Sequence, residues 1–439
     1  MKLIHTADLH LGQIIYRHYE RADEHDHFFR QLSQWCAEEH PDALLLTGDI
    51  FDIQQPSAAT WRRFTDHFVA LHHRHPDMKI ILLAGNHDSP SRLHAHRAVW
   101  REIGTEIVAL PPAADIDALP AGWEEDYVVS LPAGYVVAIP FMAAERPMLL
   151  QHLLDYVAER NTSLLPVVMT GHLAVTGCDV TGHDFDIGRI RTTPLDRLGQ
   201  GYDYLALGHI HHPQTLLHTA DALLECVSYP APVARYSGSA LHVSCDETYP
   251  HSVSVVEIPS HGGMVTIRQR RIEQLRHFLT IPPRGETAPT DAEEALAMLE
   301  TLAMEAAGSG AEHYVRFRLP RAIWLPSDFN QKVYDIIARH GDHLRYNPKI
   351  DGGGADPAAG SDADADATPQ FEVAELQQMT DPLQFIEQTI DRYPGLDLDM
   401  MRSLFTEIRK EVEAISDSPA ATPDSPFTSS SSTSTPMQS

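Results

Sequence analysis

Residues 1–260 alternate short, nearly uninterrupted apolar runs with longer segments of helical periodicity. Segment 20–39 places Phe28 and Leu32 on one helix face, and segment 58–71 repeats the same spacing. Apolar runs without a polar face are typical of strands that are covered on both sides of a sheet. Later runs indicate a second sheet or hairpins. We therefore expect an α/β fold for residues 1–260, a layered α/β/β/α sandwich.

A different pattern begins after residue 260. Two β-like runs and two helical segments fit a small α+β unit that spans residues 261–350. The β-like runs are 265–268 and 313–319, and the helical segments are 292–307 and 329–340. The chain is therefore expected to continue from the sandwich into a second, smaller domain.

The last part of the chain changes composition again. Residues 351–370 are rich in Asp, Ala and Gly and lack an apolar pattern, which predicts a disordered linker. Residues 371–415 regain helical periodicity in two amphipathic segments that either pack back on the body or dock on a partner, and we favour the partner. The Ser/Thr/Pro-rich residues 416–439 are expected to be a disordered tail.

Five of the apolar runs stop abruptly at Asp, Asn or His. In chain order the endings read DxH, GD, GNHD, GH and GHxH, and the polar side chains are Asp8, His10, Asp49, Asn86, His172, His209 and His211. Ligands of open α/β sheets gather beyond the carboxyl ends of the strands. A single ending of this kind would mean little, but five of them predict one dinuclear metal site collected from one sheet.

The ligand types narrow the choice of metal. A mixture of carboxylate, imidazole and carboxamide suits Mn²⁺, Fe²⁺ or Zn²⁺ and is too rich in nitrogen for a Mg²⁺ or Ca²⁺ cage. Two ions with about four protein ligands each need about eight contacts, so seven residues suffice if one carboxylate bridges. Glycines precede four of the motifs, where a missing Cβ permits sharp turns and close approach, at Gly48, Gly85, Gly171 and Gly208.

Two metal ions held close together form the clamp for in-line displacement at phosphorus, so the expected reaction is phosphoester hydrolysis. The leaving group also needs a proton. His87 lies next to a ligand, and Asp88 follows it and could orient its ring. We expect His87 and Asp88 to act in catalysis, the alternative for His87 being a purely structural role beside the metals.

Composition limits the setting of this site. The formal charge of −28 argues against a general basic surface that grips nucleic acid, so affinity must come from the metals, local patches or a partner. No run approaches the ~20 apolar residues of a membrane span, and no signal-peptide core precedes His5. Four cysteines without CxxC spacing suit a reducing compartment. We therefore expect a cytoplasmic protein without membrane contact.

The five motifs, in this order, resemble those of the calcineurin-like metallophosphoesterases. The residues that flank the motifs indicate a narrower group within this superfamily. They look like SbcD, the nuclease subunit of the bacterial SbcCD complex, at His5–Gln13, Gly48–Asp52, Ala84–Ser89 and Leu207–His211. Tyr236–Ser239, followed by Cys245–Glu247, also looks like the end of that family's nuclease domain. The motif resemblance covers residues 1–250.

The resemblance implies a division of the ligands between two ions, with Mn²⁺ as the metal. One ion would be held by Asp8, His10, Asp49 and His211, and the other by Asp49, Asn86, His172 and His209, so that Asp49 bridges. His87 would contact the scissile phosphate. The implied activities are 3′→5′ double-strand exonuclease and single-strand endonuclease, which opens DNA hairpins.

The resemblance also implies partners. These are duplex DNA ends and hairpins, an SbcC-like ATPase subunit, and a second copy of this chain in a homodimer. Residues 261–350 would then be a DNA-capping domain and 371–415 the helices that dock on the ATPase. The arginines of the small unit would be either ordinary strand-face charge or a DNA-facing patch, namely Arg268, Arg270, Arg271, Arg276, Arg316, Arg318 and Arg321.

Two other functions remain open at this stage. A small-substrate metallophosphatase or phosphodiesterase would share every ligand, although Ile50–Asp52 replaces the Asp-Arg-Gly segment usual in protein phosphatases of this superfamily. A non-catalytic scaffold with a decayed metal site is disfavoured because decay would normally remove a ligand.

Overall fold

The computed structural model describes residues 1–350 except 114, 117–118, 182–190 and 217–225. The linker, docking helices and tail expected at 351–370, 371–415 and 416–439 therefore lie outside the described residues. Within the described part of the chain, no helix combines the length and apolarity needed to cross a membrane.

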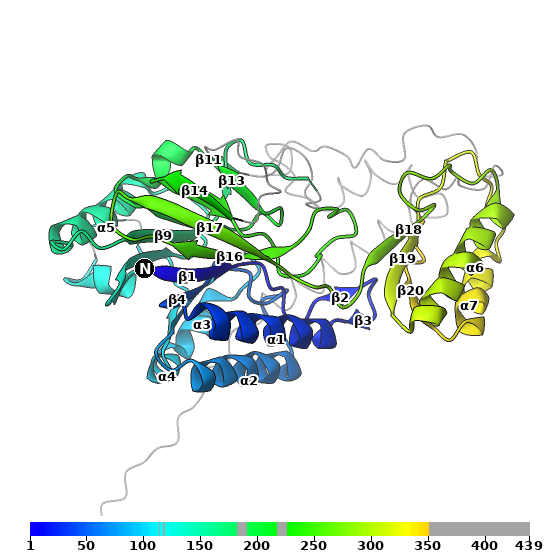
Figure 1. The fold of residues 1–439 in the computed structure, drawn as a ribbon, viewed down its shortest axis with the longest axis horizontal. Coiled ribbons are helices and arrows are strands. Elements are labelled where there is room, and N and C mark those ends of the chain that lie inside the picture. Colours follow the sequence, from blue (N-terminus) through cyan, green and yellow to red (C-terminus); the bar gives the residue numbers. More distant parts are fainter. Residues whose placement is uncertain (114, 117–118, 182–190, 217–225, 351–439) are drawn as a thin grey trace, which may run out of the picture. The chain divides into compact units, whose positions relative to one another are not determined.

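Two large sheets form the body of the fold (Figure 1). The first has seven strands in the order β14-β17-β16-β1-β4-β5-β6, of which β1, β4, β5 and β6 run parallel. The strands are β1 (Lys2–Thr6), β4 (Ala43–Leu46), β5 (Lys79–Leu83), β6 (Thr105–Val108), β14 (Cys226–Pro230), β16 (Ser252–Glu257) and β17 (Met264–Arg271).

The second sheet has six strands in the order β13-β15-β12-β9-β8-β7. Its strands are β7 (Val128–Leu131), β8 (Gly134–Ile139), β9 (Val167–His172), β12 (Tyr204–Gly208), β13 (Gln214–Leu216) and β15 (Val233–Tyr236). The central strands β8, β9, β12 and β15 are parallel. The chain therefore builds the parallel part of the first sheet, then the second sheet, and completes the first sheet with the antiparallel strands β14, β16 and β17.

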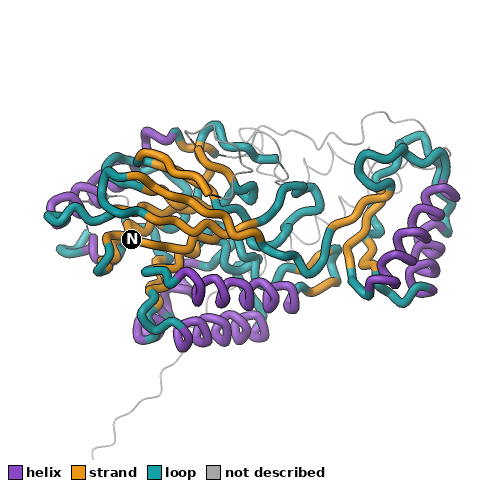
Figure 2. The backbone as a smooth tube through the Cα atoms, in the orientation of Figure 1, coloured by secondary structure: helices purple, strands orange, loops and turns teal. Residues whose placement is uncertain are grey.

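Alternate residues of β1 explain how the layers are held together. Leu3 belongs to a core formed with residues of the second sheet and of helix α5 (Pro147–Arg160). Ile4 belongs to a separate core with helices α1 (Ala22–Glu39) and α2 (Ala58–Arg74), which lie side by side in Figures 1 and 2. Because successive strand residues face opposite sides, both faces of this sheet are buried, and the predicted layered α/β/β/α fold is confirmed.

The helices begin and end where local chemistry favours it. Ser57 caps α2 by accepting a hydrogen bond of 3.1 Å from the backbone N–H of Thr60. Asp291 does the same for α6 (Ala292–Ser309), whose end is marked by Gly310 at φ 68°. The shorter elements are α3 (Pro90–Ala95), α4 (Arg97–Glu102), β2 (Ile14–Ile15), β3 (Tyr19–Glu20), β10 (Ala174–Val175), β11 (Thr192–Thr193) and 3₁₀ turns at Trp123–Asp126 and Leu195–Leu198.

The ligand-bearing strands do not share one sheet, and the prediction that they do is wrong. β1, β4 and β5 belong to the seven-stranded sheet, whereas β9 and β12 belong to the six-stranded one. Apolar runs alone cannot distinguish these cases, because strands of two stacked sheets are buried alike. The carboxyl ends of both sheets meet at one edge of the sandwich.

The small unit has a core of its own. It combines the sheet β18-β19-β20 with two helices that pack against it. Its elements are β18 (Phe278–Ile281), α6, β19 (His313–Phe317), α7 (Phe329–Arg339) and β20 (Leu344–Tyr346). Segment 265–268, assigned to this unit from the sequence, instead lies in β17 of the large sheet, because Glu257 to Ser252 of β16 pair with Thr266 to Arg271. The boundary expected at residue 261 therefore falls inside a hairpin of the sandwich.

Most arginines singled out in the sequence are engaged in ion pairs. Arg268 and Arg270 bind Glu39, a buried acid at the end of α1. Three others bind acids of the sandwich in the pairs Arg276–Asp23, Arg316–Asp246 and Arg318–Asp246. For these five arginines the structure favours ion pairing within the chain over a patch that faces DNA.

Candidate metal centre

All seven sequence-predicted ligands converge at the carboxyl edge of the two sheets. The loops after β1, β4 and β5 carry three motifs, and the ends of β9 and β12 carry the other two. Side-chain ligand atoms within 4.8 Å of one another form three groups: Asp8, His10 and His211; His10, Asp49 and His87; and Asp49, His172 and His209. The groups share His10 and Asp49, so they form one continuous cluster.

Asp49 lies at the centre of this cluster. Its Oδ2 is 3.3 Å from Nε2 of His172 and 3.9 Å from Nε2 of His10. Its Oδ1 accepts a hydrogen bond of 2.9 Å from the backbone N–H of His87. One carboxylate oxygen therefore faces imidazoles that come from different sheets, which is the position a bridging ligand would need.

One side of the cluster contains Asn86, His172 and His209. The Oδ1 of Asn86 is 3.0 Å from Nε2 of His172. The other ring nitrogen of His172 donates a hydrogen bond of 2.8 Å to the backbone carbonyl of Thr47. This bond fixes the tautomer and leaves the Nε2 lone pair directed at the cluster, as metal-binding histidines require.

The other side contains Asp8, His10 and His211. Nε2 of His10 is buried without a hydrogen-bond partner among the described residues. Its Nδ1 lies 3.2 Å from Oδ1 of Asp52. Both oxygens of Asp8 accept the backbone N–H of His209, at 3.1 and 3.2 Å. A buried nitrogen without a partner costs free energy unless something binds it, and a metal ion fits that position.

The backbone around the cluster is strained or crowded. Asp8, His10, Asp49 and His209 all have positive φ, at 51°, 46°, 48° and 94°, a conformation that costs of order 1–3 kcal/mol per residue and gathers at functional sites. A Cβ added at Gly85 would lie 2.1 Å from Oδ1 of Asp49. This position therefore needs glycine because of close approach to the central carboxylate.

The charges of the cluster also favour bound cations. Burial raises the pKa of Asp8 to about 7. Burial opposes ionisation of Asp49 as well, but the neighbouring His172 and His10 hold the Asp49 pKa below its usual range. Buried carboxylates need compensating positive charge. With imidazole and carboxamide donors beside them, two divalent ions match this donor set.

His87 and Asp88 do not form the pair that was expected from the sequence. The ring of His87 is exposed, and its Nδ1 donates to the backbone carbonyl of Asp52 at 2.8 Å. Asp88 does not orient that ring, so this expectation is wrong. Instead its buried carboxylate accepts three backbone N–H groups at 2.8–3.1 Å, from Ile50, Phe51 and Gly85. Asp88 thus ties together the loops that carry Asp49 and Asn86.

Two acids that contact predicted ligand histidines were not recognised as such from the sequence. Asp52 lies beside Nδ1 of His10, and Oε1 of Glu247 is 2.9 Å from Nδ1 of His211. Asp52 follows the GD motif closely, so its position in the sequence could have indicated that it lies near the predicted metal centre. Glu247 lies 36 residues beyond His211, and only the folded loop brings the two together.

The chain is similar in sequence to known proteins. The calcineurin-like phosphoesterase family matches residues 1–213. The SbcD component of the SbcCD nuclease from Rhodobacter capsulatus is 29% identical over 331 residues, which cover 69% of this chain and 76% of that protein. The SbcD component of the Escherichia coli nuclease is 30% identical over 264 residues, which cover 56% of this chain and 62% of that protein.

Among solved structures, a dimetal phosphatase from Danio rerio aligns with 62% of this chain and 99% of its own, at 13% identity and a TM-score of 0.35. At so low a TM-score, no inference follows from this likeness. The sequence relatives and the family match are therefore the comparisons that bear on function.

Proposed function

We propose that this chain, which belongs to the calcineurin-like phosphoesterases and is related to the SbcD nuclease subunits, is a metal-dependent DNA nuclease. The observation that carries the proposal is the central position of Asp49, with Oδ2 between His172 at 3.3 Å and His10 at 3.9 Å. We assign Asp8, His10, Asp49 and His211 to one ion and Asp49, Asn86, His172 and His209 to the other.

The reaction is hydrolysis of a phosphodiester. When bound, the two ions supply the Lewis acidity for in-line displacement at phosphorus. The chain's own contribution is to hold its ligand rings in one tautomer, through the bonds from His172 to Thr47 and from His211 to Glu247. His87 is exposed beside the cluster, and its Nδ1 is already bound to Asp52. Its Nε2 is thus the atom that would contact the scissile phosphate or, when both ring nitrogens are protonated, donate a proton to the leaving oxygen.

The substrate and partners are proposed from the resemblance to SbcD. The names of the relatives describe one subunit of a nuclease complex, which supports a nuclease that acts together with another subunit. We propose DNA ends and hairpins as the substrate, 3′→5′ exonuclease and endonuclease activity, and an SbcC-like ATPase as the partner. We further propose Mn²⁺ as the metal, a homodimer, and a cytoplasmic role in replication, recombination and repair. The small unit would cap the DNA, and 371–415 would dock on the ATPase.

The experiment is an assay of the full chain loaded with Mn²⁺, with and without the ATPase partner. The substrates are a hairpin DNA and bis-p-nitrophenyl phosphate. We expect the hairpin to be opened and its duplex ends degraded when the partner is present. Turnover of the small diester without any DNA cleavage, even with the partner, would instead support the small-substrate phosphodiesterase.

A further inference from the structure

A loop at residues 237–247, here called the junction loop, lies against a proposed metal ligand. Oε1 of Glu247 in this loop accepts a hydrogen bond of 2.9 Å from Nδ1 of His211. Both side chains are buried, with 3% of Glu247 and 5% of His211 exposed. Because this bond places the proton on Nδ1, it turns the Nε2 lone pair of His211 toward Asp8 and His10.

Glu247 is itself held in place from several directions. Its Oε2 accepts the backbone N–H of Val243 at 3.1 Å and lies 3.5 Å from Oγ of Ser239. Nε2 of His251 is 3.3 Å from the same oxygen. A carboxylate fixed in this way cannot move without disturbing the ring that it holds, so the conformation of the junction loop determines the orientation of His211.

The neighbouring residue Asp246 is bound by the small unit. Its Oδ1 accepts hydrogen bonds from Nη2 of Arg316 in β19 and, at 3.1 Å, from Nη2 of Arg318 just after that strand. Arg316 is buried, with 5% of its surface exposed. Alternate residues of a strand face opposite sides, and Val315 and Phe317 of β19 enter the core of the small unit. The other face of β19 therefore faces the sandwich.

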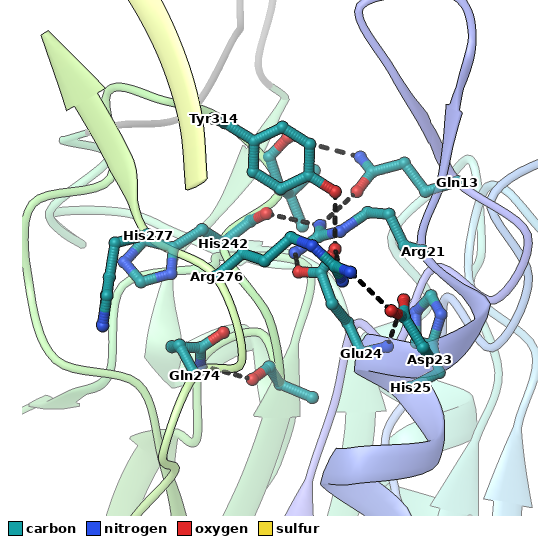
Figure 3. Close-up of polar contacts among 12 residues, drawn as sticks. Gln13, Arg21, Asp23, Glu24, His25, His242, Gln274, Arg276, His277 and Tyr314 are labelled. Atoms are coloured by element: carbon teal, nitrogen blue, oxygen red, sulfur yellow. Dashed lines mark hydrogen bonds and ion pairs between the residues drawn. The ribbon is translucent and has the colours of Figure 1, made fainter. Parts of the chain in front are cut away.

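The middle of the junction loop is held by the sandwich. Nη1 of Arg21 donates to the backbone carbonyl of His242 at 2.6 Å and to Oε1 of Gln13 at 2.7 Å. Figure 3 shows Arg21 beside Glu24, whose carboxylate accepts the hydroxyl of Tyr314 from β19. The same strand face thus contacts the sandwich at two places, α1 and the junction loop.

We propose that Glu247 is a positioning residue for His211, and that Asp246, held by Arg316 and Arg318, makes the orientation of that ligand depend on the seating of the small unit. The inference rests on the proposed metal site. The two adjacent acids have different partners. Glu247 holds a proposed metal ligand, and Asp246 holds the small unit, which would cap the DNA. Displacement of β19 would pull the loop and weaken the metal site that contains His211.

Mn²⁺ binding to the purified full chain, measured by isothermal titration calorimetry, tests the role of Glu247 as a positioning residue. Glu247→Ala should weaken one of two sites by roughly 10- to 100-fold, the effect usual for a group that orients a ligand histidine. Glu247→Gln keeps the volume, but its amide cannot offer acceptors to both His211 and Val243, so it should also lose affinity. Wild-type affinity in Glu247→Gln would overturn the role of Glu247, even if Glu247→Ala fails to fold.

The proposed link between Asp246 and the small unit can be tested with a matched control. Asp246→Asn should weaken the same site by roughly 3-fold or more, a coupling of ordinary size. Asp328→Asn weakens an ion pair with Lys332 that lies within the small unit, at 3.0 Å, without touching the junction loop or the sandwich, and should leave Mn²⁺ affinity unchanged. Equal effects of the two substitutions, or none from Asp246→Asn, would overturn the link to the small unit.

His211→Ala separates failure of this inference from failure of the proposed function. If His211→Ala binds Mn²⁺ as the wild type does, then the assignment of this ligand is wrong. If His211→Ala loses a site while Glu247→Gln and Asp246→Asn do not, then the metal centre stands and only the positioning role falls. Far-UV circular dichroism of each metal-free variant shows that the chain is folded.

Discussion

Nδ1 of His87 donates a hydrogen bond of 2.8 Å to the backbone carbonyl of Asp52. This bond commits one ring nitrogen to the loop and leaves Nε2 on an exposed side chain beside the cluster. His87 is thus held in one orientation without being buried, which suits a group that meets substrate more than one that stabilises the core.

Replacement of His87 by Ala should therefore separate chemistry from metal binding. We expect hairpin cleavage to fall by about 10²- to 10⁴-fold, the range for loss of a positioned proton donor. Calorimetric titration should still show two Mn²⁺ sites. Loss of metal in parallel with activity would make His87 a structural or ligating residue instead.

Asp88 is expected to act on stability. Its carboxylate accepts three backbone N–H groups from two loops, and Asp88→Ala would leave these buried donors without partners. Hydrogen bonds to a charged group contribute about 1.5–3 kcal/mol each, so the free energy of unfolding should fall by roughly 3 kcal/mol or more. Urea unfolding measures this. Asp328→Ala, which removes an exposed pair with Lys332, should stay within about 0.5 kcal/mol.

Gly85 tests the close packing around Asp49. A Cβ at this position would meet Oδ1 and the backbone N of Asp49 at 2.1 and 2.2 Å, so Gly85→Ala must displace the central carboxylate. We expect Mn²⁺ affinity to fall at least 10-fold. Gly308, inside α6 with nothing within 4 Å of an added Cβ, is the control. Gly308→Ala should keep both sites and stabilise the chain by about 1 kcal/mol. Unchanged metal affinity in Gly85→Ala would contradict the packing argument.

His5 predicts how stability depends on pH. It is fully buried between the sheets, where its ring contacts Tyr204, Thr47 and the carbonyl of Leu207. Burial, with the charge of Arg235, lowers its pKa from 6.5 to about 3. Between these values the unfolded chain binds the extra proton, so stability falls as pH drops below about 6.5.

From pH 7.5 to pH 5 the His5 contribution should amount to roughly 2 kcal/mol. Urea unfolding at the two pH values measures it. His5→Gln keeps a donor for Leu207 but does not titrate, so its stability should decline less over this interval by about that amount. An identical decline in the two proteins would show that His5 does not contribute.

Much of the fold could be predicted from the chain because its signals are local. Apolar runs such as Leu44–Leu46 identified strands, and the polar residues after them predicted side chains that the structure brings into one cluster. What failed depended on distant pairing. No local pattern shows that β17 returns to pair with β16, or that β9 and β12 form a second sheet.

The site shows the same division. The predicted ligands stand in short motifs, so their types and order could be read from the sequence, whereas the residues that hold them in place could not. Asp88 looked like a partner of His87 because it is adjacent, yet its carboxylate faces the backbone of Ile50 and Gly85. Glu247 reaches His211 only through a loop that closes after β15. Adjacency in sequence was a poor guide to contact in these cases.

The count of metal ions tests the dinuclear centre most directly. Calorimetric titration of Mn²⁺ into the metal-free chain should give two ions per chain, and Asp49→Ala, which removes the shared carboxylate, should weaken both sites at least 10-fold. Circular dichroism confirms that the variant is folded. One ion per chain in the wild type, or an Asp49→Ala chain that keeps one site at wild-type affinity, would contradict a dinuclear centre bridged by Asp49.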